Sequence, residues 1–251
     1  MNHRKVLRPL AIIAACLVPA FAAMAQAPQM PGAGMNTALT KLFGKHTSFS
    51  GKADVQMSGG VGGNLSMTMD VAILDGKVRS DIDMAKMKSS QLPPDAAEGM
   101  KQMGMDRMSS IVKPEENTMC LIYPGLKGYT EMVLPSDEAA SMKENYKIEK
   151  TEAGKETLHG RATVKHKVTI TDSKGTKQEA LMWTAPDLKD FPIKVEMTEK
   201  ATKMTIVYSD VKLGKPDAAL FAPPADFTKH ANVQAMMQVA MMRVLGGGAK
   251  P

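Results

Sequence analysis

LSMTMDVAILDGKVRSDIDM, residues 65–84, is the stretch that decides the fold. Its first half alternates apolar and polar side chains, with Leu65, Met67, Met69, Val71 and Ile73 on the apolar parity. A period of two predicts a strand with one apolar and one wet face. Asp75-Gly76 is typical of a tight hairpin turn, and the alternation continues beyond it through Val78, Ile82 and Met84.

The same pattern extends outward from this hairpin. Residues 47–59 alternate in the same way and precede a glycine turn, so residues 47–84 predict a three-stranded antiparallel meander. Further strands are predicted at 108–113, 118–123, 128–134, 146–151, 157–171, 178–184, 192–199 and 203–213, with a turn at 172–175 and a bulge near Ser209-Asp210. We therefore expect a mainly β fold: a large curved antiparallel sheet of about ten strands forming an open half-barrel, covered by a few short helices.

Helical segments are few. We expect them at about residues 36–45, 93–104, 136–143 and 229–245, with boundaries uncertain by about two to four residues. The domain organisation that follows is a signal at 1–25, a flexible Pro/Gly linker at 26–35, a half-barrel domain at 36–228, and a C-terminal amphipathic helix with a disordered tail at 229–251.

Residues 1–25 have the composition of a cleavable secretory signal. Three basic residues precede an apolar run from Leu10 to Ala23, and Ala23-Met24-Ala25 offers small residues for a signal peptidase. The run is shorter than the roughly 20 residues that span a bilayer. We expect an exported, periplasmic protein that is soluble after cleavage. Lipidation of Cys16 is the alternative, because the residues before it loosely resemble a lipoprotein box.

Charge and cysteine content exclude some classes of protein. The signal removes three of the 32 basic residues and no acidic ones, which leaves 29 basic against 26 acidic residues. That small, dispersed excess does not predict a nucleic-acid partner. Cys120 alone remains after cleavage, so an internal disulfide is impossible and stability must come from a core. With 23 methionines and 4% aromatic residues, that core is soft and unbranched.

The apolar parity of the strands predicts a ligand-binding groove on the concave face. We expect it to be lined by Met67, Met69, Ile82, His166, Val168, Ile193 and Met204. His166 shares its parity with Val164, Val168 and Ile170, so it is either a satisfied core residue or a polar contact inside a cavity. We expect no cofactor, because the histidines are not at metal-ligand spacing and no catalytic triad or phosphate loop is present.

Methionines in two segments have two interpretations. As a lid or gate, Met100 and Met103 together with Met237 and Met241 would cover the groove through adaptable packing. As soft ligands, the thioethers of Met100, Met103, Met105 and Met108 would bind Cu(I). Copper binding would require all four positions, whereas a lid would tolerate leucine.

Three segments carry a resemblance to a known family. TALTKLFGKHTSFSGKADVQM (37–57) leads a short helix into a long strand, and LMWTAPDLKDFPIKVEM (181–197) and MTIVYSDVKLGKPDAALFAPPADF (204–227) close the domain. Together they resemble the periplasmic lipoprotein-carrier (Lol-type outer-membrane lipoprotein sorting) superfamily, and most closely an uncharacterised domain family within it. The resemblance covers about residues 37–228 and implies a half-barrel with a lipid or lipoprotein acyl cargo.

The leading functional hypothesis is a non-enzymatic periplasmic carrier that holds an acyl chain, a lipid or a lipidated protein in its groove. A transient membrane contact is compatible with it. The alternatives are a methionine-rich periplasmic copper-binding protein and a structural envelope protein whose groove is filled by its own helix. The sequence leaves open the ligand, the oligomeric state and whether the groove is open.

The processing site gives the first prediction. Cleavage after Ala25 should leave an exported protein that begins at Gln26, because Ala23 and Ala25 occupy the positions that the peptidase reads. Intact-mass analysis of the exported protein measures this. A mature chain that begins at a lipid-bearing Cys16 would contradict both the cleavage site and the soluble state.

Overall fold

The computed structural model describes residues 41–60, 63–93, 95–136, 139–140, 144–199 and 201–245. They belong to one compact unit, Ala33–Pro251. The strands are β1 Ser48–Gly59, β2 Leu65–Leu74, β3 Lys77–Asp83, β4 Lys88–Ser89, β5 Arg107–Lys113, β6 Thr118–Tyr123, β7 Gly128–Val133, β8 Lys147–Leu158, β9 Arg161–Thr171, β10 Lys177–Ala185, β11 Phe191–Glu199, β12 Thr202–Leu213 and β13 Thr228–His230. The helices are α3 Ala96–Gln102 and α5 Val233–Leu245, with short 3-10 turns η1 Met84–Lys86, η2 Pro124–Leu126, η3 Pro186–Leu188 and η4 Ala218–Phe221.

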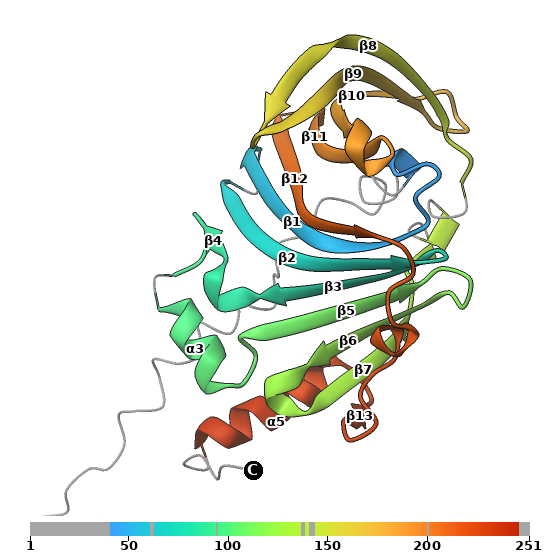
Figure 1. The fold of residues 1–251 in the computed structure, drawn as a ribbon. Coiled ribbons are helices and arrows are strands. Elements are labelled where there is room, and N and C mark those ends of the chain that lie inside the picture. Colours follow the sequence, from blue (N-terminus) through green and yellow to red (C-terminus); the bar gives the residue numbers. More distant parts are fainter. Residues whose placement is uncertain are drawn as a thin grey trace, which may run out of the picture. The chain divides into compact units, whose positions relative to one another are not determined.

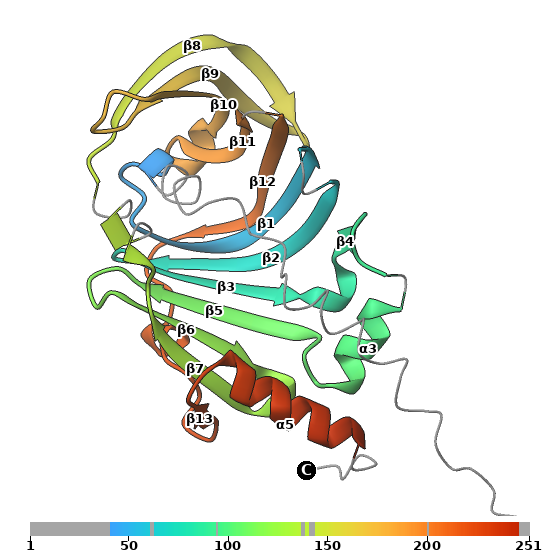
Figure 2. The ribbon, with the colours of Figure 1, turned by 180° about the vertical axis from the view of Figure 1, so that it is seen from behind.

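The strands form one 13-stranded sheet whose order is β13-β7-β6-β5-β3-β2-β1-β12-β11-β10-β9-β8, with β4 added beside β2. Every pair is antiparallel except β13 with β7. The sheet does not close: β8 and β13 are its two ends, and the half from β2 to β8 curls over (Figures 1 and 2). This confirms the predicted open half-barrel.

The deciding hairpin forms as its sequence predicts. Asp75 and Gly76 both have positive φ, 46° and 86°, which is the type I′ geometry whose twist suits two antiparallel strands. Beside it, β1 pairs with β2 and β2 pairs with β3, so the meander over 47–84 is confirmed.

The predicted bulge lies between β1 and β12. Their register shifts between Ser50 and Lys52, where Asp210 has a φ of 52°. Opposite it, a Cβ on Gly51 would lie 3.0 Å from the Ser209 carbonyl oxygen, so the close approach of the two backbones favours glycine. Lys52 Nζ lies 2.7 Å from Asp210 Oδ2 across the bulge.

The structure corrects several predicted boundaries. The strand predicted at 157–171 is divided, because the turn between β8 and β9 falls at His159 and Gly160, both with positive φ. The final helix begins at Val233 rather than 229, since residues 228–230 pair with β7 as β13. The helix predicted at 93–104 covers 96–102 only. Gly104 ends it in the left-handed conformation, with Met105 N donating to Met100 O and Gly104 N to Lys101 O, as in a Schellman motif.

Several predictions fall partly or wholly outside the described residues. These include the signal and linker (1–35), the tail (246–251) and most of the helix predicted at 36–45, of which 41 and 42 are described and helical. Of the helix predicted at 136–143, only 136 and 139–140 are described, and they are helical. The domain boundaries therefore stay predictions.

The two faces of the sheet bury different sets of side chains. The concave face carries a cluster of buried, mostly apolar side chains, called here the concave-face cluster. Its members are Leu42, Ala53, Val55, Met67, Ile82, Val168, Ile170, Ala180, Met182, Val195, Met197, Met204 and Ile206. The convex face of β2, β3, β5 and β6 carries Ala72, Ile111, Cys120 and Ile122, which pack under Phe221. Residues 214–227, called here the strap, run across that face, and Arg79 Nη1 donates to the Leu220 carbonyl oxygen at 2.7 Å.

An aromatic cluster closes one end of the curl. The ring centroid of Phe191 lies 4.7 Å from that of Phe49 and 5.5 Å from that of Phe43, and Tyr208 packs at the margin. Phe49 and Phe191 are both fully buried. Aromatic pairs of this kind stabilise beyond the area that they bury.

This cluster gives a stability prediction. Phe191→Ala should lower the free energy of unfolding by about 3–5 kcal/mol, because it leaves a cavity among three rings. Val133→Ala is the control: Val133 is 71% exposed, and its loss should cost less than about 1 kcal/mol. Urea unfolding monitored by circular dichroism measures both, and equal losses in the two variants would contradict the packing described.

Candidate functional site

Strand register arranges the concave face in rows that cross the curl. In one row His166, Met182, Val195, Ile206, Val55 and Met67 lie side by side on β9, β10, β11, β12, β1 and β2. In the next row the same strands contribute Val168, Ala180, Met197, Met204, Met57 and Leu65. Because cross-strand partners point to the same face, the second row is a continuous apolar path across six strands, and the first is apolar over the five strands other than β9, where it ends at His166.

The structure brings the predicted groove residues onto this one face. Met67, Ile82, Val168 and Met204 are buried within the concave-face cluster, and Met69 is partly buried against it. Ile193 lies two residues before Val195 on β11, so it shares the face, and it packs with the aromatic cluster beside Phe191. Their role in binding a ligand stays a prediction.

Methionines form much of the margin of the cluster. Ten partly buried residues pack against it, and five of them are Met57, Met69, Met84, Met87 and Met108. Of these five, Met84 directly precedes residues 85–108, and Met87 and Met108 lie within that segment, which also contains the predicted lid residues Met100 and Met103. Leu42 adds cover from within the curl, where Figure 1 shows the start of the described chain.

His166 is the polar member of the first row. Its Nε2 lies 3.0 Å from the hydroxyl oxygen of Thr184, which is buried. Burial lowers the pKa of His166, the positive charge of Lys150 lowers it further, and Glu152 and Asp190 act in the opposite sense. The imidazole is therefore held neutral on this face, as a hydrogen-bonding group beside an apolar path.

Charged residues appear only where the rows reach the end strand β8. Lys150 pairs with Val168 and Glu152 pairs with His166, so both side chains stand on the concave side. Sequence reasoning missed Lys150 and Thr184 as members of this face. Lys150 lies two residues after Ile148, so the two side chains point to the same face of β8. This alternation is present in the sequence KIEKTE, but the many charged residues of the strand hide it.

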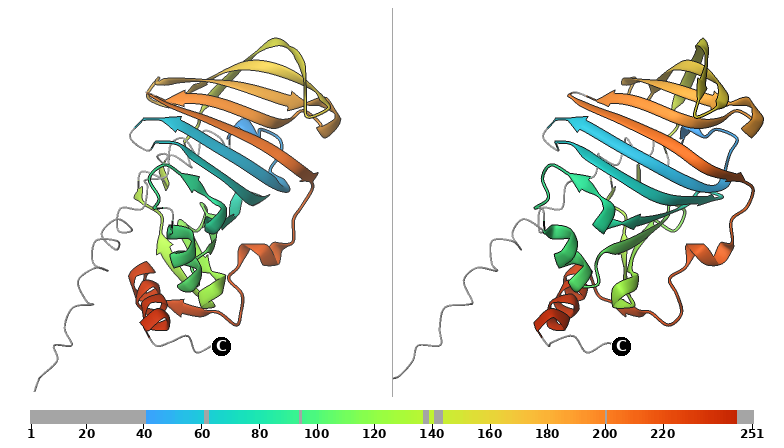
Figure 3. Two further views of the ribbon diagram at one scale, coloured as in Figure 1. Left: turned by 90° about the vertical axis from the view of Figure 1, so that its left-hand side faces the viewer. Right: turned by 60° about the vertical axis from the view of Figure 1, so that its left-hand side comes forward.

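The predicted lid residues divide between two places. Met100 is buried in α3, which packs against η1, and Met103 packs with Leu126, Tyr123 and the α5 residues Met236 and Ala240. On α5, Met237 is half-buried and Met241 is 37% exposed. Figure 3 shows α3 and α5 near each other at the end of the sheet away from the curl.

The terminal helix does not contribute to the concave-face cluster. α5 packs against β7 and η2 (Figure 2), and Arg243 Nη1 fixes its end by donating to the Gly125 carbonyl oxygen at 2.5 Å. No α5 residue belongs to the concave-face cluster among the described residues. The expectation that this helix covers the groove therefore does not match its packing, because Leu126 at the β6–β7 corner offers it a separate apolar contact.

The four methionines of the copper alternative are also separated. Met103 and Met105 pack in the cluster of α5, while Met108 packs against the concave-face cluster and accepts a hydrogen bond from Tyr123 Oη at 3.6 Å. This arrangement does not favour one shared ion. Within the described part of the chain, no group of three His, Cys, Asp or Glu side chains is placed to hold a metal.

An open hollow of about 530 Å³ lies at the rim where β1, β2, β4 and β12 meet. Gln56, Ser66, Lys88 and Thr205 line it from the convex parity of their strands, and Met57 and Leu65 also contribute to its lining. Most of the residues that line the hollow are thus polar, and the hollow lies at the rim of the sheet.

No helix among the described residues is long and apolar enough to cross a membrane. The chain matches no family model and no curated protein.

Solved structures with a similar course of the chain include the following three. The Mycobacterium tuberculosis lipoprotein LppX is 13% identical, with a TM-score of 0.40 over 71% of this chain and 93% of that chain. LprF from Mycobacterium bovis is 12% identical, with a TM-score of 0.37 over 77% of this chain and 97% of that one. A LolA-superfamily protein from Nitrosomonas europaea is 13% identical, with a TM-score of 0.32 over 75% and 96%. The last is described as a member of the superfamily that the sequence resembles.

The lowered pKa of His166 gives a pH prediction. An unfolded chain has the ordinary histidine pKa of 6.5, whereas the pKa of His166 in the folded protein is lower. Between these two pKa values the unfolded state binds the proton more readily, so the free energy of unfolding should fall as the pH drops through this range. His166→Gln keeps a hydrogen-bonding side chain that does not titrate, so it removes the part of the stability loss at low pH that comes from His166. Urea unfolding at about pH 7.5 and 5.5 should show that the variant is more stable relative to wild type at the lower pH. A difference that is the same at both pH values would contradict the assignment.

Proposed function

We propose that the protein is an exported, non-catalytic carrier that works in the periplasm and holds an acyl chain, of a lipid or of a lipidated protein, along the rows of its concave face. The observation that supports this most is the continuous apolar path across six strands, bordered by five partly buried methionines. An unbranched, flexible thioether adapts its shape to a neighbour, which suits a cargo without a fixed shape.

The energetics favour a long chain as cargo. Burial of each CH₂ group contributes roughly 0.8 kcal/mol, so ten of them would contribute about 8 kcal/mol. Entry of the chain requires the cover to move. The cover near Met84 and Met87 is connected through α3, a helix of only seven residues, and such short elements open at less cost than the strands of the sheet.

Binding rather than catalysis is favoured by the chemistry of the groups present. His166 contacts the Thr184 hydroxyl, and the candidate thiol lies elsewhere: Cys120 is on the convex face. Burial raises the pKa of Cys120 to about 11, so its thiol is protonated and poorly nucleophilic at neutral pH.

A charge placed beside the apolar rows should weaken binding. Met69→Glu is expected to weaken binding of a dansyl-labelled fatty acid by at least about tenfold, because an unpaired carboxylate would stand among the side chains that pack against the concave-face cluster. Met242→Glu is the matched control: Met242 is 67% exposed on α5, away from the concave-face cluster, and should bind as wild type does.

Fluorescence titration measures these affinities, and circular dichroism confirms that each variant is folded. Met69→Leu supplies a second check that does not depend on tolerance of a charge, since it should retain binding. If wild type binds no acyl probe, the carrier function is wrong, and a structural role in the envelope takes its place.

A further inference from the structure

Lys150 stands at the end of one apolar row. Its cross-strand partner is Val168, which is 1% exposed, and the row continues through Ala180, Met197 and Met204. Lys150 therefore belongs to the concave face, although Lys150, like most of β8, is exposed. A chain that lies along this row brings one of its ends to Lys150.

Lys150 has no charge partner. Within the described part of the chain no carboxylate lies within 4.0 Å of its ammonium group, whereas Lys147 on the same strand pairs with Glu149 at 2.8 Å. Burial lowers the pKa of Lys150, and the negative charge of Asp190 raises it by a smaller amount. The carboxylate of Asp190 forms its ion pair with Lys45, at 3.9 Å. An ammonium group that stands at the end of an apolar row and forms no ion pair among the described residues is a favourable position for an anion.

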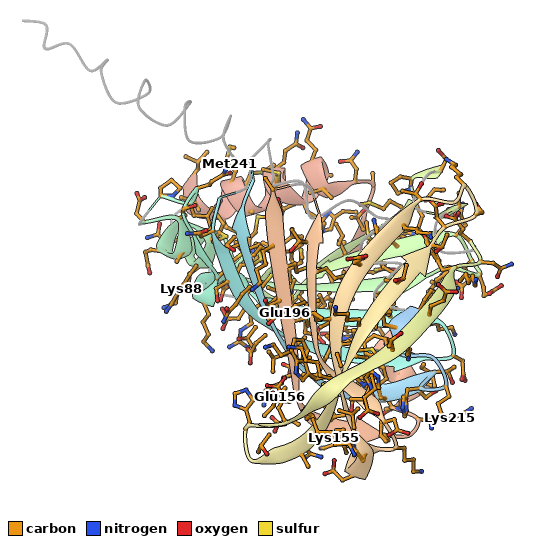
Figure 4. All side chains as sticks on the ribbon, turned by 90° about the horizontal axis from the view of Figure 1, so that it is seen from above. Lys88, Lys155, Glu156, Glu196, Lys215 and Met241 are labelled. Atoms are coloured by element: carbon orange, nitrogen blue, oxygen red, sulfur yellow. The ribbon has the colours of Figure 1, made fainter. Side chains whose placement is uncertain are left out.

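The surroundings of Lys150 carry charges of both signs. Glu152 is the next residue of β8 on the same face. The bulge at Ala153-Gly154 shifts the register by one residue, so Lys155 pairs with Val164 and also lies on this face. Glu156 has the other parity and accepts a hydrogen bond from the Trp183 indole on the convex face. Figure 4 shows Lys155 and Glu156 next to each other on the end strand.

We propose that Lys150 binds the negatively charged head group of the cargo, a carboxylate or a phosphate, while the acyl chain lies along the row from Val168 to Leu65. The inference rests on the proposed carrier function and names its ligand class: an anionic amphiphile. β8 is the end strand of the sheet, so the head group stays in contact with water while the chain is buried.

The test compares a dansyl-labelled fatty acid with its methyl ester, two probes that differ only in the charge of the head group. Lys150→Met keeps the length and the apolar stem of the side chain and removes the charge. Lys147→Met makes the same change on the other face of β8 and is the matched control. Lys150→Met should weaken binding of the acid by about tenfold and change binding of the ester by less than about twofold, as expected for loss of a charge-assisted contact. Lys147→Met should change neither.

Each outcome decides one question. Equal effects of Lys150→Met on the acid and the ester, or no effect on either, overturn the role of Lys150 and leave the carrier function standing. Failure of wild type to bind both probes overturns the carrier function and this inference together. Competition by an alkyl phosphate and by an alkanoate of equal chain length then identifies the head group, since the stronger competitor carries the chemistry that Lys150 prefers.

Discussion

Antiparallel pairing with a fixed register is the constraint on which the rest of this structure depends. Side chains alternate strictly across each strand, so one register decides for every residue whether it faces the inside or the outside of the curl. From β9 to β2 that register aligns six side chains in each row, all of them apolar except His166. The bulge at Asp210 and Gly51 allows β1 and β12 to keep this alignment while the pair bends. A slip of one residue would place Lys194 and Glu196 on the inside instead of Ile193 and Val195.

The two faces of the sheet are completed by different means. On the convex face the strap supplies Phe221 to cover Ile111 and Ile122, and Arg79 links the strap to the sheet. The guanidinium of Arg79 also donates two 2.7 Å hydrogen bonds to Asp81, a bidentate arrangement that fixes its plane. Trp183 is covered on that face by Lys165 and Lys194, whose ammonium groups lie 4.9 and 4.3 Å from the centroid of its ring. On the concave face, the polar contacts of the described rows lie at one side, at His166 and along β8.

That difference connects the packing to the proposed function. A face that is closed by ion pairs and aromatic contacts is specified in detail and resists change, whereas a face bordered by methionines tolerates rearrangement of its neighbours. His166 and Lys150 then provide polarity at one side of an otherwise apolar path, the first neutral and hydrogen-bonded, the second charged and without a partner. An amphiphile fits this gradient better than a uniformly apolar ligand, because each part of it meets a surface of its own polarity.

The sequence by itself determined most of the strands, the hairpin at Asp75-Gly76, the bulge near Asp210 and most of the residues on the concave parity, because these depend on local alternation and turn chemistry. It did not determine the His159-Gly160 turn, since β8 is highly charged and carries no apolar period, although β9 alternates through Val164, Val168 and Ile170. Only the tertiary structure decided that α5 packs on Leu126 and that Met103 and Met108 belong to different clusters. It also showed that Lys150 ends an apolar row. These facts depend on which distant strands become neighbours, and a strand's own residues do not encode the identity of its neighbour.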